Sequence, residues 1–212
     1  MKNIVEFQNV SRVYTAGDHE LRALDGVNMT LTEGSFVVIL GPSGAGKSTL
    51  LNLLGGLDSP TEGKIIVDGQ DISRLTGDEL AAYRAATVGF VFQFYNLVPT
   101  LTVHENVKLV DEIAPHPLSA TKMLEEVGLS DHLKNFPSEL SGGEQQRVSL
   151  ARAFAVKSDV VLLDEPTASM DATLSERVTE QICAFAKQRL VILASHSAEQ
   201  LAAADAKIVL GE

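Results

Sequence analysis

Residues 35–49 of this chain read Ser-Phe-Val-Val-Ile-Leu-Gly-Pro-Ser-Gly-Ala-Gly-Lys-Ser-Thr, and this segment decides the fold. Its first part, residues 35–40, is an apolar run that predicts a buried strand. The spacing Gly-x4-Gly-Lys-Ser that follows lets backbone N–H groups point into a loop and hold phosphate oxygens. A helix predicted over residues 49–57, ended by two glycines and a Ser-Pro pair, would add its positive N-terminal end. The segment therefore predicts a phosphate-binding loop between a strand and a helix.

Length, composition and charge limit the function classes. The 212 residues are 45% hydrophobic, which predicts one globular domain. The formal net charge of −11 argues against nucleic-acid binding and against adsorption on anionic lipid. The single cysteine, Cys183, fits a reducing cytoplasm. The first seven residues hold no apolar signal core, and no run approaches the ~18 apolar residues of a membrane span. Any membrane part is expected to be another chain.

The order of predicted elements indicates an α/β fold. Short β-rich runs alternate with amphipathic helical runs, which predicts a mostly parallel sheet covered by helices. The runs at residues 4–7 and 29–31 predict antiparallel strands at the N-terminal end. Further strands are predicted at residues 64–67, 88–92, 160–163 and 190–194, and the last two are apolar throughout, as central parallel strands are. Residues 1–212 are interpreted as one domain, with a core at about 1–95 and 157–212 and an inserted helical subdomain at about 96–156.

The glycine loop carries the first set of candidate binding residues. Lys47 would reach the β- and γ-phosphates of a nucleotide, and the Ser48 hydroxyl would bind Mg²⁺. The predicted nucleotide-binding residues in and around the loop are Gly41, Pro42, Ser43, Gly44, Ala45, Gly46, Lys47, Ser48 and Thr49.

Asp164 and Glu165 end an apolar strand, so both carboxylates should lie at the carboxyl edge of the sheet, where α/β proteins bind ligands. Asp164 would hold Mg²⁺ through water, and Glu165 would act as the general base toward an attacking water. An acidic pair at a helix N-terminus is the competing interpretation, and it would be preferred without the glycine loop.

His196 and Gln93 follow two other predicted strands and should reach the same edge. His196 would contact the γ-phosphate and orient the water, and Gln93 would reach Mg²⁺ or the water. An ordinary polar residue at a strand end remains the alternative for Gln93.

A second glycine motif, Leu-Ser-Gly-Gly-Glu-Gln-Gln-Arg at residues 140–147, precedes a predicted helix over residues 144–154. Ser141 is a favourable N-cap, and Gly142 and Gly143 would expose backbone N–H groups. The motif predicts a second anion-binding helix N-terminus.

These motifs, in this order, resemble the nucleotide-binding subunits of ATP-binding-cassette (ABC) transporters. The resemblance covers nearly the whole chain, from Tyr14 to His196. The stretches at residues 53–58 and 92–102 are similar to the subgroup that includes ATPases for lipoprotein release, macrolide efflux and antimicrobial-peptide resistance. The resemblance implies a P-loop NTPase fold, ATP and Mg²⁺ as cofactors, and stacking of Tyr14 on adenine.

The resemblance also implies an ATP-dependent head-to-tail homodimer. Each ATP would contact Ser141, Gly142, Gly143 and Glu144 of the other chain, and Asp171 would lie at the dimer interface. A membrane permease would dock near Phe94–Pro99, with Tyr95 and Leu97 in that surface, and would hold the ATPase at the inner face of the membrane. Export or extraction from the membrane is the expected work.

Other functions use related motifs. An ATPase that transmits force to a non-transporting membrane complex, as in cell division, would carry the same residues, so the motifs leave this alternative open. DNA-repair or translation ATPases of the superfamily need a coiled-coil insertion or tandem cassettes, which this chain lacks. A guanine-reading motif is only faintly suggested by residues 156–159, which lack the leading Asn and precede the acidic strand.

Overall fold

A parallel five-stranded sheet forms the centre of the computed structural model, which describes residues 2–17, 19–92, 95–168 and 170–211. Its strand order is β6-β7-β8-β3-β9, and each neighbouring pair with a recorded register is parallel. The strands span Phe36–Leu40 (β3), Val88–Val91 (β6), Val160–Asp164 (β7), Leu190–Ala194 (β8) and Ala206–Val209 (β9). The three central strands, β3, β7 and β8, are buried nearly end to end, as strands covered on both faces must be.

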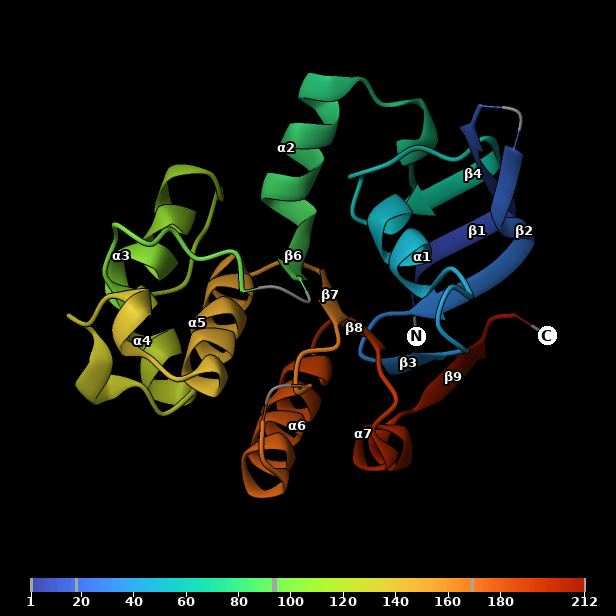
Figure 1. Cartoon of the computed structure of the whole chain (residues 1–212). Helices are drawn as coiled ribbons and strands as arrows, with labels where there is room; N and C mark the ends of the chain where they lie inside the picture. Colours follow the sequence, from blue (N-terminus) through green and yellow to red (C-terminus); the bar gives the residue numbers. More distant parts are fainter. Residues whose placement is uncertain (1, 18, 93–94, 169, 212) are drawn as a thin grey trace.

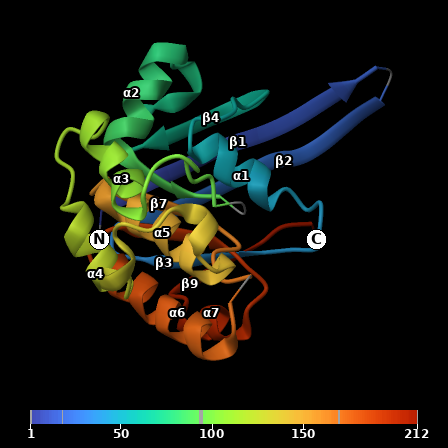
Figure 2. The same cartoon turned by 60° about the vertical axis from the view of Figure 1, so that its left-hand side comes forward.

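A second sheet, antiparallel, lies beside the first and has the order β2-β1-β4-β5 (Figure 1). Its strands span Asn3–Ala16 (β1), His19–Thr32 (β2), Glu62–Val67 (β4) and Gln70–Asp71 (β5). The antiparallel prediction for the N-terminal strands is confirmed, although β1 and β2 are much longer than predicted. In Figure 2 these two strands project as a long hairpin, and Tyr14, Leu21 and Ala23 of this hairpin line the cleft at the glycine loop discussed below.

The two faces of the parallel sheet are packed differently. Alternate residues of a strand point to opposite faces, so Val161 and Leu163 join one core while Val160 and Leu162 join the other. The second core is closed by α1 (Lys47–Leu54) and the antiparallel sheet. Helices cover the first core (Figure 1); they include α3 (Val103–Lys108), α4 (Ala120–Glu126), α5 (Gly142–Ala155) and α6 (Ala172–Ala186).

Several predicted boundaries were wrong. The first helix begins at Lys47 rather than Thr49 and ends at Leu54, because Gly55 caps it and Gly56 follows with a φ of 62°. The strands predicted from Ser35 and to Phe92 are each one residue shorter. The stretch at residues 96–156 is mainly helical, as predicted; besides α3, α4 and α5 it holds the 3₁₀ turns η2 (Leu109–Glu112), η3 (Ser130–His132) and η4 (Pro137–Glu139).

The elements that were not predicted include η1 (Ile72–Arg74), α2 (Gly77–Thr87), α7 (Ala198–Ala203) and the strands β5 and β9. The sequence signal for α2 was Thr76-Gly-Asp-Glu79, whose side chains and backbone form a capping box. Among the described helices, none is both long and apolar enough to cross a bilayer.

Candidate functional site

Three strand ends meet at one edge of the parallel sheet and build the site. Ala194, the last residue of β8, pairs with Ile39 of β3 on one side and with Asp164 of β7 on the other. Residues that follow these strands therefore converge, as at the carboxyl edge of other α/β sheets. The sequence prediction that the glycine loop, Asp164 and His196 lie at one edge is confirmed.

The backbone of the loop requires glycine at two positions. Gly46 has a φ of 93°, and a Cβ there would lie 2.3 Å from the Ala23 carbonyl oxygen of β2. Gly41 has a φ of 151°, and a Cβ there would lie 2.6 Å from the Leu210 carbonyl oxygen. Because any side chain would clash with main chain at both ends, the tight course of residues 41–46 depends on these glycines.

Lys47 brings a positive charge into the loop. Its Nζ donates to the Gly41 carbonyl oxygen at 2.7 Å and to the Pro42 carbonyl oxygen at 3.0 Å. Both acceptors are neutral, and among the described residues no carboxylate forms an ion pair with this ammonium group, so the loop interior favours an anion.

Ser48 and Asp164 form an oxygen pair at the base of the loop. The Ser48 hydroxyl donates to Oδ2 of Asp164 at 2.8 Å. A hydroxyl and a carboxylate are the hard oxygen ligands that Mg²⁺ takes in nucleotide sites, where most other positions go to water and phosphate. This pair therefore fits the predicted Mg²⁺.

Glu165 is held beside His196 by an unusual backbone conformation. Its φ is 49°, and its N–H donates to the Ala194 carbonyl oxygen at 3.0 Å. Such a conformation is costly for a non-glycine residue and is kept where a side chain must be aimed. The Glu165 Oε1 atom lies 3.7 Å from Nε2 of His196.

The surroundings of Glu165 make its carboxyl a better proton acceptor than an ordinary one. Burial raises its pKa, and the neighbouring Asp164 charge raises it further, while His196 and Lys47 oppose the shift. A raised pKa is what a general base near neutral pH needs.

All these groups line one cleft of about 350 Å³, which we call the loop cleft. Its described lining consists of Tyr14, Leu21, Ala23, Ser43, Gly44, Gly46, Lys47, Ser48, Thr49, Asp164, Glu165 and His196. Most of the predicted nucleotide-binding and catalytic residues are thus brought together, including Tyr14 from β1. Gln93 lies outside the described residues, and its predicted contacts stay a prediction.

The second glycine motif lies apart from this cleft. Ser141 is the N-cap of α5, and its hydroxyl accepts from the Glu144 N–H at 3.4 Å. The Glu144 carboxylate accepts from both the Ser141 N–H and the Ser141 hydroxyl at 2.7 Å. Both bonds lower the pKa of Glu144, and the bond from the Ser141 hydroxyl lowers it more than the bond from the Ser141 N–H. The predicted helix N-terminus is therefore present as a capped helix end, and its binding of an anion stays a prediction.

Asp171, the predicted interface residue, caps α6. Its Oδ1 accepts from the Leu174 N–H at 2.9 Å. Its contact with another chain stays a prediction.

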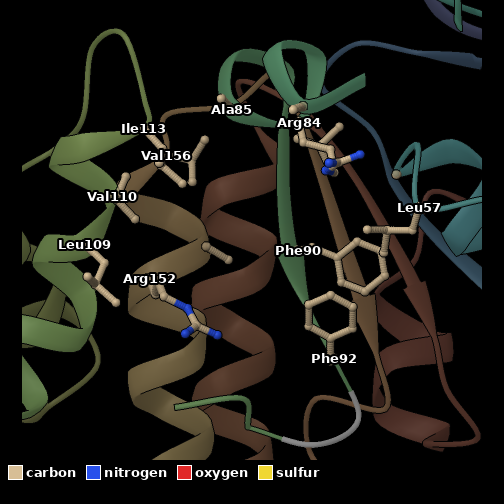
Figure 3. A pocket seen from close by; sticks show the side chains of 14 residues that line it. Leu57, Arg84, Ala85, Phe90, Phe92, Leu109, Val110, Ile113, Arg152 and Val156 are labelled. Atoms are coloured by element: carbon tan, nitrogen blue, oxygen red, sulfur yellow. The ribbon is translucent and has the colours of Figure 1, made fainter. Parts of the chain in front are cut away.

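A second cleft, of about 440 Å³, is mainly apolar, and none of its described lining residues belongs to the predicted docking segment (Figure 3). We call it the apolar cleft; it is lined by Gly55, Leu57, Ala81, Arg84, Ala85, Val88, Phe90, Phe92, Leu109, Val110, Ile113, Arg152, Ala153 and Val156. Figure 3 shows Leu57 and Phe90 on one side and Leu109 and Ile113 on the other. Its walls come from distant segments of the chain, so spacing alone could not assemble it.

Arg152 joins the apolar cleft to the segment predicted to dock a permease. Its guanidinium donates to the Asn96 carbonyl oxygen at 2.7 Å and to the Tyr95 carbonyl oxygen at 3.3 Å. Leu97 packs against the first core instead of standing free, and Phe94 lies outside the described residues. The predicted docking segment therefore borders this cleft.

Comparison with known proteins places these motifs in a family. Residues 24–168 match the family model described as ABC transporter. An uncharacterized ABC transporter ATP-binding protein of Thermotoga maritima is 45% identical over 85% of this chain and 79% of its own length. The macrolide export ATP-binding/permease protein MacB of Hyphomonas neptunium is 44% identical over 98% of this chain, which spans only 33% of that protein.

A solved structure has the same fold. The ATP-binding cassette MJ0796, in a dimeric post-hydrolysis state bound to ADP and Pi, superposes with a TM-score of 0.90 at 36% identity. The superposition covers 98% of this chain and 94% of that one. With the loop cleft described above, these matches show that the chain belongs to the ABC transporter family, as an ATP-binding and ATP-hydrolysing cassette.

Proposed function

We propose that the loop cleft binds ATP with Mg²⁺ and hydrolyses it to ADP and phosphate. The observation that carries this proposal is the convergence of the Ser48–Asp164 pair and the Glu165–His196 pair on the glycine loop, with 2.8 and 3.7 Å between their respective atoms. One pair fits a metal-bound phosphate, and the other fits a water that attacks it.

In the proposed reaction, the water oxygen attacks the γ-phosphorus and the bond to the β–γ bridging oxygen breaks, so ADP leaves. Glu165 accepts the proton that the water loses, and His196 orients the water against the γ-phosphate. Lys47 leaves its loop carbonyl acceptors and donates to the β- and γ-phosphates. Mg²⁺ held by Ser48 and, through water, by Asp164 would neutralise charge on the phosphates. The Gln93 amide would reach Mg²⁺ or the water and so respond to whether a γ-phosphate is bound.

We further propose that two copies of the chain close head to tail around two ATP molecules. The N–H groups of Ser141, Gly142 and Gly143 would then face the γ-phosphate held by the other copy. Glu144 would fix this helix end through its bonds to Ser141, and Asp171 would lie at the interface. The similarity to the dimeric cassette MJ0796 supports this arrangement.

The apolar cleft is the proposed docking site for a permease. Ile113 and Leu57 are large apolar residues exposed by 63% and 45% at its rim. Within the described residues, neither Arg84 nor Arg152 pairs with a carboxylate; Arg84 donates to the Gly56 carbonyl oxygen at 2.7 Å, and burial lowers the pKa of Arg152. We therefore assign the cleft to a permease segment with an apolar face and a carboxylate, which would supply the missing negative charge.

The permease would hold the chain at the inner face of the membrane, and the similarity to MacB proteins favours export. A force-transmitting complex that moves no substrate is the alternative. A vesicle assay with the co-purified membrane partner separates the two, since ATP turnover without a transported substrate would favour the alternative.

Replacing the general base tests the central proposal. Glu165→Gln should keep ATP binding and lower turnover by about 10²–10⁴-fold, the usual contribution of a general base. Because ATP then persists, sizing with light scattering in Mg-ATP should show a stable dimer. Normal ATP turnover in this variant would contradict the assignment of Glu165 as the base. A variant that stays monomeric at saturating ATP would contradict the proposed head-to-tail dimer.

A further inference from the structure

Tyr14, the predicted adenine-stacking residue, is held by two side chains, Arg12 and Asp58, for which the motifs predict no role. Its hydroxyl donates to Oδ2 of Asp58 at 2.8 Å. The Arg12 guanidinium lies over its ring, 4.6 Å from the ring centroid. Arg12 and Asp58 are themselves joined, with Nη2 and Oδ1 at 2.8 Å. The three side chains thus form a closed triangle, each bonded to the other two.

The triangle links two separate parts of the chain. Arg12 and Tyr14 are two residues apart on β1, so their side chains share one face of the antiparallel sheet. Asp58 lies beyond the end of α1, the helix that follows the glycine loop. A tyrosine on an edge hairpin is therefore tied to the element that carries the phosphate-binding residues.

The three interactions leave little freedom to the ring. A hydroxyl bonded at one end and a guanidinium against one face together fix the plane of an aromatic side chain that is otherwise partly exposed. Tyr14 lines the loop cleft, whereas Arg12 and Asp58 are not among its described lining residues. The two partners therefore hold the ring from outside the cleft and leave it open to a ligand.

Leu21 extends the surface that the ring offers. It lies directly across from Tyr14 in the β1–β2 pairing, which places both side chains on the same face, and it also lines the loop cleft. Leu21 is 66% exposed, a large exposure for a leucine. An aromatic ring beside an exposed aliphatic side chain makes an apolar platform on which a planar base can stack.

We infer that Asp58 and Arg12 are positioning residues for nucleotide binding: they pre-orient Tyr14 so that it and Leu21 stack the base. This inference rests on the proposed ATP site and names how that site holds the base. The pre-ordered ring loses less conformational freedom on binding than a free tyrosine would. The Tyr14 hydroxyl already donates to Asp58, and the side chains of Leu21 and Ala23 have no polar atom that could bond to the edge of a base. The platform therefore recognises a planar purine by its face rather than by its edge.

Comparing ATP with inorganic tripolyphosphate, which has no base, tests this role. Tyr14→Ala should weaken ATP binding roughly 5- to 150-fold, the range for loss of one base-stacking contact. Tyr14→Phe removes the bond to Asp58 and should weaken ATP binding about 3- to 10-fold. Asp58→Ala removes that bond and also the ion pair with Arg12, so it should weaken ATP binding at least as much. The double variant should be no weaker than the worse of the two singles, because both break the same bond. Tripolyphosphate affinity should change less than about twofold in all four, since the phosphate contacts stay.

Further variants separate positioning from stability. Asp58→Asn keeps an acceptor for the Tyr14 hydroxyl but loses the charge that holds Arg12, so its ATP affinity should fall between wild type and Asp58→Ala. Asp71→Ala is the matched control, because Asp71 is a partly buried carboxylate that pairs with Arg74 away from the cleft. Its ATP affinity should equal that of wild type. Fluorescence of ethenoadenosine triphosphate should be quenched by stacking in wild type and less so in Asp58→Ala.

The outcomes are distinguishable. Equal loss of ATP and tripolyphosphate affinity in Asp58→Ala would mean that Asp58 only stabilises the fold, and unchanged ATP affinity would mean that it does not position Tyr14. GTP should bind within about tenfold of ATP, because stacking tolerates different bases; discrimination beyond 100-fold would reveal edge recognition and overturn that part. Lys47→Ala should weaken both ligands, and its failure to do so would reject the proposed ATP site itself.

Discussion

The two glycine-rich segments of this chain, residues 41–46 and 142–143, are both predicted to bind an anion, but they differ in their surroundings. Around the first, strand ends supply Asp164, Glu165 and His196 within one cleft. The second begins α5, where Ser141 and Glu144 bond to each other, and it is not part of that described lining. The first segment thus has its reacting groups beside it, whereas the second offers a helix end whose ligand has to come from outside. This difference is what we expect if the second segment contacts the ATP held by another copy of the chain.

The strongest test of this contrast alters the second segment alone. Ser141→Arg should leave ATP binding to the single chain intact, because the loop cleft is unchanged. It should lower hydrolysis by about 10²–10³-fold, the usual effect of losing donors to developing charge. The measurements are ATP affinity by titration and turnover at saturating ATP.

Ser119→Arg is the matched control. Ser119 caps α4 through a bond of the same kind, accepting from the Lys122 N–H at 3.4 Å, but it lies outside the glycine motif. Normal hydrolysis in this variant would show that loss of a cap is not the cause. If Ser141→Arg lost ATP binding as well, both segments would belong to one site or the variant would be misfolded.

The converse change alters the first segment. Lys47→Ala should weaken ATP binding roughly 10- to 150-fold, which corresponds to one charge-assisted hydrogen bond of about 1.5–3 kcal/mol. Because Lys47 donates only to loop carbonyls in the described structure, the fold should tolerate the change. Isothermal titration gives the affinity, and thermal unfolding checks the fold. Unchanged affinity would contradict the assignment of the loop.

A smaller effect concerns the pH dependence of the first site. Burial and Asp164 raise the pKa of Glu165, and the base works only when ionised. The acid limb of kcat/KM should therefore lie above 4.5, the ordinary value for a glutamate. His196→Ala removes a neighbour that lowers this pKa, so the acid limb of the residual turnover should move to higher pH. An acid limb at or below 4.5 in wild type would contradict the assigned base.

The sequence predicted the first site well because its chemistry is local in the chain. Gly41–Ser48 is one continuous motif. Asp164 and His196 each follow an apolar run whose composition predicts a buried strand. Parallel strands then bring those ends together by topology, without any detail of packing. The fold class was predictable for the same reason.

What the sequence did not predict depends on contacts between distant segments. The apolar cleft needs Leu57, Phe90 and Ile113 to meet, and these residues come from three separate segments of the chain. The link between Tyr14 and Asp58 crosses from β1 to the turn after α1. Helix α2 was missed because, among its residues, Tyr83 is the buried one, so it lacks the apolar period that marks a helix.

The smallest predicted effect concerns Glu144 at the second segment. Its pKa is lowered by bonds to Ser141, so its ionised form is favoured in the folded state. That contribution to stability is present above the unfolded value of about 4.5 and is lost as pH falls through the lower folded value. Glu144→Gln should therefore lower the Tm at pH 7, and the difference from wild type should shrink below pH 4.5. Thermal unfolding from pH 7 to pH 3 measures this, with Glu176→Gln, exposed on α6, as the control. A difference that stayed constant with pH would mean that the Ser141–Glu144 bonds do not depend on the charge.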